Sequence, residues 1–388
     1  MNSPHLPVTR LGTAFATSPT AHARHFPDGA DLLPLWLAEP YLPLAPVVVE
    51  AIQARAAEGW FGYEERPRAV VDSFSAWMKQ RHGWGTDGLE MLVSPSIGTS
   101  IGVLLDLLTD PGDGVILQPP VFTDFKPLVQ QAAREVARNP LRLDDGRYVM
   151  DVDGLAAIAA EPAVTAMILC NPHNPVGRVW SAEELAQVAA VCAEHDVFVI
   201  ADEIHADLML PPHRFSPFAT AAAGTGVRWA ALHGPIKTFG VAGLCDTLLI
   251  TDDDEAAAGF GATSSALHLN RKNVFGLAAF RAGYESGGPW LDELLDRIVA
   301  NIEMLQRDLP DPIALVEPEA TYLAWLDLRG LGIAVPELAT WLSSQAGLAL
   351  SPGHWFGREG AGFARMSIAV EPEVLADAIE RLTVAVGT

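Results

Sequence analysis

The sequence predicts an α/β protein built on a largely parallel sheet with helices on both faces. Apolar runs rich in β-branched residues alternate with helical patterns along most of the chain. Several of these runs are continuously apolar, which is typical of strands buried on both faces. Asn174, Asp202 and Lys237 each come at or just after the end of such a run. Ligands of open α/β sheets bind beyond the carboxyl ends of the strands, so these three residues mark a candidate site.

The elements of the first part follow one another in a regular order. A helix over 46–57 begins at a proline in its first turn, where the missing N–H costs nothing. Ser181 and Glu184 have capping-box spacing, which predicts the start of a helix that runs to about His195. The other predicted helices are 100–109 and 122–133, and the predicted strands are 91–94, 114–118, 163–170, 197–201 and 227–232.

From about residue 291 the pattern changes to that of a smaller α+β unit. It predicts a long helix, a strand over 321–328, a helix over 335–345 and a last helix over 373–386. We therefore expect an N-terminal segment (1–45) that packs with the small domain, a large domain (46–288) and a small C-terminal domain (289–388). A length of 388 residues agrees with two domains.

Composition excludes several classes of protein. No apolar run reaches the roughly 18 residues of a membrane span, and the N-terminus has no apolar signal-peptide core, so we expect a cytoplasmic protein. The net charge of −23 disfavours nucleic acid and anionic lipid as partners. The three cysteines form no CxxC pair, and the histidines lack metal-ligand spacing, so neither disulfides nor a metal site is expected.

Lys237 is one of only four lysines in the chain, and it begins an apolar, glycine-rich run. Loss of solvent would lower the pKa of its amine, as formation of a Schiff base requires. The ordinary alternative is a surface lysine on a loop. Pyridoxal 5′-phosphate (PLP) chemistry needs such a lysine, together with an acid that keeps the pyridine nitrogen protonated.

Three further residues supply the other groups that PLP chemistry needs, although each also has an ordinary structural reading. Asp202 ends a buried strand and could pair with a pyridinium, or it could cap a helix or form a buried salt bridge. Asn174 could donate to the cofactor, or its Asn-Pro could only form a turn. Arg365 could clamp a substrate carboxylate, or it could lie on the surface.

In this order the motifs resemble those of the class I/II aminotransferases: NPHNPVG at 171–177, DEIH at 202–205, KTFGVAGL at 237–244, then Arg365. The chain is most similar to the PatB/MalY-type cystathionine β-lyase (C–S lyase) branch. His205 stands in place of the tyrosine usual in aminotransferases, and Cys245 stands in place of their phosphate-binding arginine. TYLAWLD at 321–327 and Gly62-Tyr63 also match this branch.

The resemblance implies the aspartate aminotransferase-like fold of PLP-dependent transferases, with a mostly parallel seven-stranded sheet in the large domain. It also implies PLP as cofactor, an amino acid as small-molecule substrate, and a homodimer with shared active sites. By this resemblance Lys237 forms the Schiff base, Asp202 partners the pyridine nitrogen, Asn174 contacts O3′ and Arg365 binds the substrate carboxylate. The other implied site residues are Ser96, Ile97 and Gly98 around the phosphate, Phe122 stacked on the ring, His205, Glu39 at the substrate entrance, and Tyr63, which reaches the neighbouring subunit's phosphate.

The chain departs from the family pattern at several positions. Gly234-Pro235-Ile236 replaces the usual Ser/Thr-x-Ser before the lysine, so two phosphate-binding hydroxyls are missing. Phe122 replaces a tyrosine, and Glu39-Pro40 replaces an Asp-Met-Asp-Phe run. Compensating phosphate charge could come from Arg271 and Lys272. His233 could touch phosphate or be a plain strand-end histidine.

The expected reaction is β-elimination from a cysteine S-conjugate to a thiol, pyruvate and ammonia, with specialisation for a bulky conjugate as a further hypothesis. The alternatives are an aminotransferase, an oxidative deaminase coupled to decarboxylation, and a regulatory protein on the same scaffold. Transamination shares the early steps of β-elimination, so the sequence separates these two reactions poorly.

Overall fold

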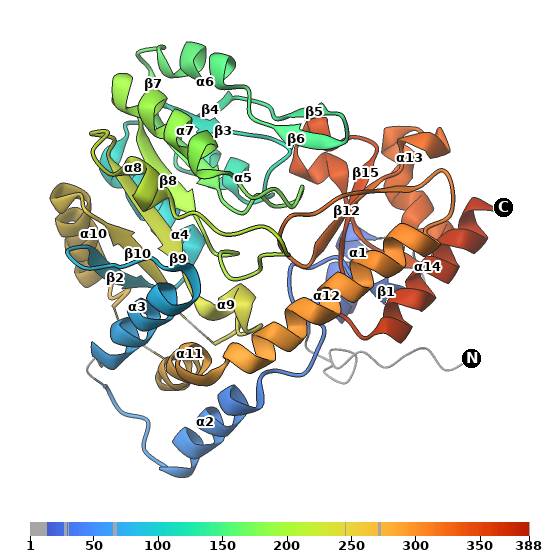
Figure 1. Cartoon of the computed structure of the whole chain (residues 1–388), viewed down its shortest axis with the longest axis horizontal. Helices are drawn as coiled ribbons and strands as arrows, with labels where there is room; N and C mark the ends of the chain where they lie inside the picture. Colours follow the sequence, from blue (N-terminus) through green and yellow to red (C-terminus); the bar gives the residue numbers. More distant parts are fainter. Residues whose placement is uncertain are drawn as a thin grey trace.

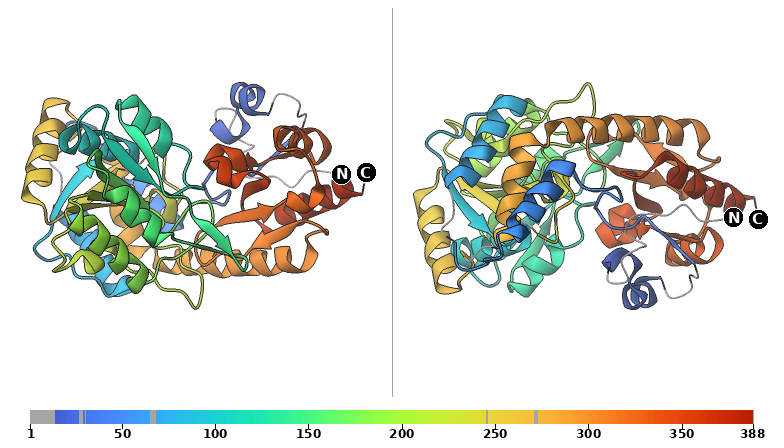
Figure 2. Two further views of the ribbon diagram at one scale, coloured as in Figure 1. Left: turned by 90° about the horizontal axis from the view of Figure 1, so that it is seen from above. Right: turned by 90° about the horizontal axis from the view of Figure 1, so that it is seen from below.

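A computed structural model describes residues 14–26, 29, 31–64, 68–244, 246–270 and 273–387 of the chain. Figure 1 shows a large sheet with helices on both faces, beside a smaller body that contains the C-terminus. Helix α12 (Gly288–Asp308) runs along both bodies, as the two views of Figure 2 also show. Within these residues no helix is both long and apolar enough to cross a membrane.

The large sheet has seven strands in the order β2-β10-β9-β8-β7-β3-β4. Strand β10 is antiparallel to both of its neighbours, and the other pairings are parallel. This confirms the predicted mostly parallel seven-stranded sheet. The bounds are β2 Glu90–Ser94, β3 Gly114–Leu117, β4 Glu135–Arg138, β7 Val164–Cys170, β8 Phe198–Asp202, β9 Trp229–His233 and β10 Thr247–Thr251.

Helices bury both faces of this sheet, because side chains alternate between the faces along each strand. Ile168, Ile200 and Leu232 share a core with the helices of one face. Leu169 and Ala201 point to the other face. The first face is covered by α4 Ile97–Leu108, α5 Phe125–Gln131 and α10 Asp254–Ala266. The second face is covered by α3 Arg68–His82, α6 Val152–Ala159, α7 Ala182–Glu194, α8 Phe218–Ala222 and α11 Val274–Ser286. Helix α2 (Pro46–Ala57) packs against α11.

Local signals in the sequence fix the starts of several helices. Ser181 and Glu184 form the predicted capping box at the start of α7. The helix predicted from residue 100 instead begins at Ile97, because the Ser96 hydroxyl caps it by accepting the Thr99 N–H at 3.0 Å. The helix predicted over 122–133 is shorter, Phe125–Gln131. A start at residue 122 would have put Pro127 beyond the first turn, where its ring clashes with the backbone.

The smaller body is built on a four-stranded antiparallel sheet in the order β11-β12-β15-β14. The N-terminal segment joins it, because β1 (Leu33–Pro34) pairs with β13 (Leu348–Ala349). The helix predicted over 335–345 is α-helical only to Thr340 and continues as a π-helical turn. The domain boundaries at 45/46 and 288/289 stay a prediction. The remaining bounds are β11 Ala314–Val316, β12 Leu323–Asp327, β14 Ser351–Pro352, β15 Phe363–Ser367, α1 Pro19–His25, α13 Val335–Thr340, α14 Pro372–Val386, and the hairpin β5 Arg142–Asp144 with β6 Arg147–Val149.

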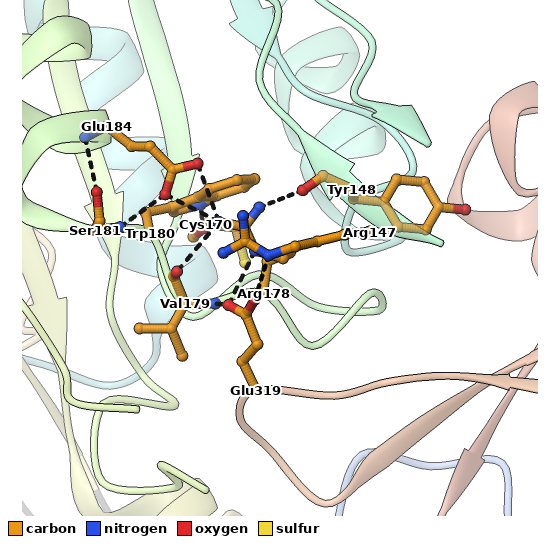
Figure 3. Close-up of polar contacts among 9 residues, drawn as sticks. All are labelled: Arg147, Tyr148, Cys170, Arg178, Val179, Trp180, Ser181, Glu184 and Glu319. Atoms are coloured by element: carbon orange, nitrogen blue, oxygen red, sulfur yellow. Dashed lines mark hydrogen bonds and ion pairs between the residues drawn. The ribbon is translucent and has the colours of Figure 1, made fainter. Parts of the chain in front are cut away.

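A buried polar network centred on Arg178 joins the two bodies (Figure 3). The side chain of Arg178 is 2% exposed, and its Nε donates to Oε2 of Glu319 at 2.9 Å. Its Nη2 donates to both carboxylate oxygens of Glu184, at 3.0 and 2.9 Å, and its Nη1 donates to the carbonyl of Tyr148. The guanidinium also lies 4.6 Å from the centroid of the Trp180 ring. All these partners except Glu319 belong to the large body.

Glu319 lies in the segment that leads into β12, and it accepts three hydrogen bonds. Besides Arg178, the donors are Nε of Arg147 at 2.7 Å and the backbone N–H of Val179 at 2.8 Å. Burial raises the pKa of Glu319, but these hydrogen bonds and the charge of Arg178 outweigh burial and hold it below the ordinary value. Charge-assisted hydrogen bonds therefore fix the start of β12 against the large body.

We expect Arg178→Leu to lower the free energy of unfolding by about 3 kcal/mol, because it removes the buried counter-charge of Glu319 and leaves only the more exposed Arg147 beside this carboxylate. Urea-induced unfolding measures this loss. As a matched control, Glu285→Gln removes the exposed Arg281–Glu285 pair and should cost less than about 0.5 kcal/mol. Equal losses in the two variants would contradict a structural role for the Arg178 network.

Candidate active site

A cavity of about 270 Å³ lies beyond the carboxyl ends of β7, β8 and β9. Parallel strands bring these ends to one edge of the sheet, which is why residues distant in sequence meet there. The cavity gathers eight of the residues that the sequence analysis selected. They are Ser96, Ile97, Gly98, Phe122, Asn174, Asp202, His205 and Lys237.

Lys237 lies in the single helical turn α9 (Pro235–Thr238), which directly follows β9 and Gly234. Its side chain is partly buried, and its Nζ donates a hydrogen bond to the carbonyl of Ala38 at 2.7 Å. Burial, and then the positive charge of Arg365, lowers the pKa of Lys237 to about 8. A substantial share of this amine is therefore neutral at mildly alkaline pH.

Asp202 is the last residue of β8 and lies on the same face of the sheet as Ile200. The carboxyl group is buried, and its Oδ1 accepts the backbone N–H of Ile204 at 3.1 Å. Burial raises the pKa of Asp202 to about 6, against the opposing effects of this hydrogen bond and of Lys237. A partner that carries a positive charge would stabilise its ionised form.

Arg365 is buried on β15, so the surface alternative for this residue is wrong. Its Nη1 donates to Oδ1 of Asn174 at 3.0 Å, and its Nη2 donates to the carbonyl of Trp36 at 2.9 Å. The guanidinium lies 4.9 Å from the ring centroid of Phe356. Burial lowers the pKa of Arg365 to about 10. Arg365 does not line the cavity itself but is joined to it through Asn174.

His205 is buried, and its Nδ1 has no hydrogen-bond partner in the described part of the chain. Burial, followed by the positive charges of Lys237 and Arg365, lowers the pKa of His205 well below its ordinary value. The imidazole is therefore neutral near pH 7 and keeps one ring nitrogen for a ligand. Its ring packs edge-on against Tyr322, with the centroids 6.1 Å apart.

Glu39 lies next to Ala38, whose carbonyl receives the hydrogen bonds of Lys237 and Tyr322. Burial raises the pKa of Glu39, and the charge of Lys237 acts in the opposite direction. Glu39 therefore lies close enough to Lys237 for the two charges to interact, although it is not among the described residues that line the cavity. Its predicted place at the substrate entrance stays a prediction. Tyr41 also lies in this segment, and its hydroxyl accepts the Leu37 N–H at 3.2 Å.

The helix α4 presents its N-terminus to the cavity through Ser96, Ile97 and Gly98. The first-turn N–H groups of a helix have no intrahelical partner, and the helix dipole favours an anion beside them. Of the N–H groups of Ile97, Gly98 and Thr99, that of Thr99 donates to the Ser96 hydroxyl. Among the described residues that line the cavity, Lys237 is the only lysine or arginine.

Several predicted residues do not meet at the cavity. Tyr63 is 85% exposed and is not among the described residues that line the cavity. His233 points to the opposite face, with Nε2 2.9 Å from Oε2 of Glu203, so the idea that it touches phosphate is wrong. Cys245, Arg271 and Lys272 lie outside the described residues.

Sequence reasoning missed Asp124, Tyr41 and Asp207. Asp124 lines the cavity two residues after Phe122, and Tyr41 lies near Glu39 and Arg365. No motif marked either residue, because their roles depend on the packing of the N-terminal segment and α5. Asp207 closely follows the motif at 202–205, and its contacts are described below.

We expect Glu39→Gln to lower the pKa of Lys237, because the charge of Glu39 raises it. Reductive methylation of the cofactor-free protein over a pH series, read by mass spectrometry, gives the midpoint at which Lys237 becomes reactive. That midpoint should be about 8 in the unmodified protein and lower in the variant. Glu337→Gln, at an exposed position in α13, is the control and should leave it in place. An unchanged midpoint in Glu39→Gln would contradict the proximity of the two charges.

Comparison with known proteins places this geometry in a family. The family model "Aminotransferase class I and II" matches residues 37–382. Cystathionine beta-lyase PatB of Bacillus subtilis (strain 168) is 37% identical over 364 residues, which are 92% of this chain and 93% of PatB. Protein MalY of Escherichia coli (strain K12) is 30% identical over 343 residues, 87% of each chain.

A solved structure agrees with these relatives. Cystalysin from Treponema denticola, whose crystal structure contains PLP, matches with a TM-score of 0.90 at 25% identity. The match covers 100% of this chain and 99% of cystalysin. The chain thus belongs to the class I and II aminotransferase family and, within it, to the branch of PLP-dependent cystathionine beta-lyases.

Proposed function

We propose that this protein is a C–S lyase that converts a cysteine S-conjugate and water into a thiol, pyruvate and ammonia. The observation that carries the proposal is the convergence of Lys237, Asp202 and Asn174 on one cavity, with Arg365 bonded to Asn174. Lys237 supplies an amine of lowered pKa, Asp202 a buried acid and Arg365 a buried guanidinium. The three groups match the needs of amino-acid chemistry at PLP.

The residues present fit PLP. The first-turn N–H groups of Ile97 and Gly98 in α4 suit its phosphate, and the buried carboxyl of Asp202 suits its protonated ring nitrogen. Lys237 would hold the cofactor covalently through its amine. The unpartnered Nδ1 of His205 offers a further polar contact. When bound, PLP supplies an electron-withdrawing ring that accepts the electrons left at Cα after deprotonation.

Each residue then has a defined task. Lys237, with its pKa of about 8, accepts the Cα proton of the substrate once its amine is free. Asp202 is ionised above pH 6 and keeps a proton on the ring nitrogen through its negative charge. Arg365 exchanges its bond to Asn174 for a two-pronged contact with the substrate carboxylate, which orients the Cα–H bond.

The loss of the thiolate from Cβ needs little from the protein, because a thiolate is a good leaving group. No oxo-acid acceptor takes part in this outcome, which is what separates it from transamination. The similarity to cystathionine β-lyases supports elimination over transamination.

We further propose a homodimer with shared active sites. The segment after α2 exposes Trp60 at 59%, Phe61 at 54% and Tyr63 at 85%, a concentration of aromatic surface that suits an interface. From such an interface Tyr63 would reach the neighbouring subunit's phosphate.

The cytoplasm, as a reducing compartment, suits the buried free thiols of Cys170 and Cys192.

The substrate assay uses purified protein with PLP and a panel that runs from cystathionine and cystine to bulkier cysteine S-conjugates. We expect equal amounts of pyruvate and of the sulfur product, which is a persulfide from cystine and a thiol from the thioethers, without an oxo-acid acceptor. Lys237→Ala should form neither product. The altered entrance at Glu39-Pro40 leads us to expect a higher kcat/KM for the bulkier conjugates. Turnover that depends on 2-oxoglutarate would overturn the lyase proposal in favour of an aminotransferase. A preference for cystathionine would overturn only the specialisation.

Arg365→Lys keeps a positive charge but removes the planar fork that binds a carboxylate through two hydrogen bonds. We expect kcat/KM to fall by about 100-fold, mainly through KM, because about 3 kcal/mol of charge-assisted hydrogen bonding is lost. Steady-state kinetics measures both constants. Arg381→Lys is the control, since Arg381 pairs with Asp377 in α14 and does not line the cavity. Equal values of kcat and KM in the two variants would contradict a role of Arg365 in substrate binding.

A further inference from the structure

The turn that carries Lys237 has few polar anchors. In Gly234-Pro235-Ile236-Lys237-Thr238 the only polar side chains are those of Lys237 and Thr238. The side chain of Thr238 is buried, and it does not line the cavity. Its Oγ1 instead donates a hydrogen bond to Oδ2 of Asp207 at 2.8 Å. This hydroxyl is therefore committed to the protein and is not a phosphate ligand.

Asp207 is a buried carboxylate with donors on both oxygens. Besides the Thr238 hydroxyl at Oδ2, its Oδ1 accepts Nε1 of Trp77 at 2.7 Å and Nε2 of His82 at 2.8 Å. Burial raises the pKa of Asp207, but the hydrogen bonds from His82, Trp77 and Thr238 outweigh it, so the pKa lies below the ordinary value. The carboxylate therefore stays ionised, and hydrogen bonds to an ionised group are the strong ones.

The two donors to Oδ1 of Asp207 lie on the side of the sheet opposite the cavity. Trp77 and His82 belong to α3, which shares a core with Leu248 and Ile250, whereas Leu249 points to the other face with α4. Phe239, the next residue after Thr238, packs edge-on against Trp77 with the centroids 5.8 Å apart. Helix α3 thus contacts the turn that carries Lys237 (234–238, the lysine turn) from the side of the sheet opposite the cavity.

Neighbouring residues of a helical turn point about 100° apart, so fixing Thr238 also fixes the direction of Lys237. The substitution of Gly234-Pro235-Ile236 leaves no other hydroxyl in the turn to do this. The charges with the largest effects on the pKa of Lys237 are those of Arg365, Glu39, Asp202 and Asp124, and that of Asp207 is not among them.

We propose that Asp207 is a positioning residue that directs the amine of Lys237 into the cavity. It acts through its hydrogen bond with Thr238, and Trp77 and His82 of α3 set its own orientation. This inference rests on the proposed role of Lys237 as the lysine that binds PLP. A small displacement of a reacting group costs about 100-fold in rate. Loss of the Thr238–Asp207 hydrogen bond should therefore reduce kcat and leave substrate binding nearly intact.

The test compares three variants of the PLP-loaded protein. Thr238→Val keeps the shape of the side chain but removes its hydroxyl, Thr238→Ser restores a hydroxyl, and Asp207→Asn removes the charge at similar size. The matched control is Thr251→Val, since Thr251 is a buried threonine of β10 whose hydroxyl donates to the Trp229 carbonyl and which does not line the cavity.

Two readouts separate positioning from a merely structural role. The first is the pH midpoint of the visible absorbance of the PLP-loaded protein, which reports the surroundings of the Lys237 nitrogen and needs no turnover. The second is the division of any kinetic loss between kcat and KM. We expect Thr238→Val and Asp207→Asn to shift the midpoint and to lower kcat by about 10- to 100-fold. Thr238→Ser should restore both, and Thr251→Val should change neither.

An unchanged absorbance midpoint and kcat in Thr238→Val would overturn the proposal, and so would a loss of thermal stability alone. Failure of the proposed lyase function gives a different result. In that case no thiol forms from any substrate, yet the absorbance midpoint still shifts in Thr238→Val, which supports positioning. An absorbance that survives in Lys237→Ala would overturn the role of Lys237 and the positioning inference together.

Discussion

The carboxyl edge of β7, β8 and β9 is the constraint on which the rest of the structure depends. Because the three strands are adjacent and parallel, their ends open on the same side of the sheet. Asn174, Asp202 and Lys237 follow or end these strands, so the hydrogen bonds of the sheet place them around one cavity. The alternation of side chains decides which of them face it: Asp202 points to the cavity, and its neighbour Glu203 points to the opposite face.

Burial of charge at this edge prepares the groups for chemistry. Removal from water shifts the pKa of Lys237 to about 8 and that of Asp202 to about 6, both toward the neutral form. An amine is nucleophilic only when neutral, and a buried carboxylate is most stable beside a cation. The same low-dielectric surroundings therefore suit both to a cofactor that has an aldehyde and a ring nitrogen that can be protonated.

The site also depends on contacts between the two bodies. Arg365 belongs to the four-stranded sheet, yet its guanidinium reaches Asn174 of the large body and Trp36 of the N-terminal segment. The network of Arg178 and Glu319 fixes the segment that leads into β12, the strand paired with β15. A shift at that connection would move Arg365 relative to the cavity. On the opposite face of the sheet, Trp77 and His82 of α3 bond to Asp207, which accepts the hydroxyl of Thr238 in the lysine turn.

The sequence by itself determined the α/β class, the capping box of α7 and the strand-end residues Asn174, Asp202 and Lys237, because periodicity, caps and strand-end motifs are local signals. The seven-stranded sheet and the other predicted residues around the cavity came from the resemblance to the class I/II aminotransferases. The tertiary structure alone decided that Arg365 is buried, that His233 turns away to Glu203, and that Asp207 holds Thr238. These contacts join residues distant in sequence, or depend on which face of a strand a side chain occupies. Such relations arise only when the sheets and helices pack together, so no local pattern could state them.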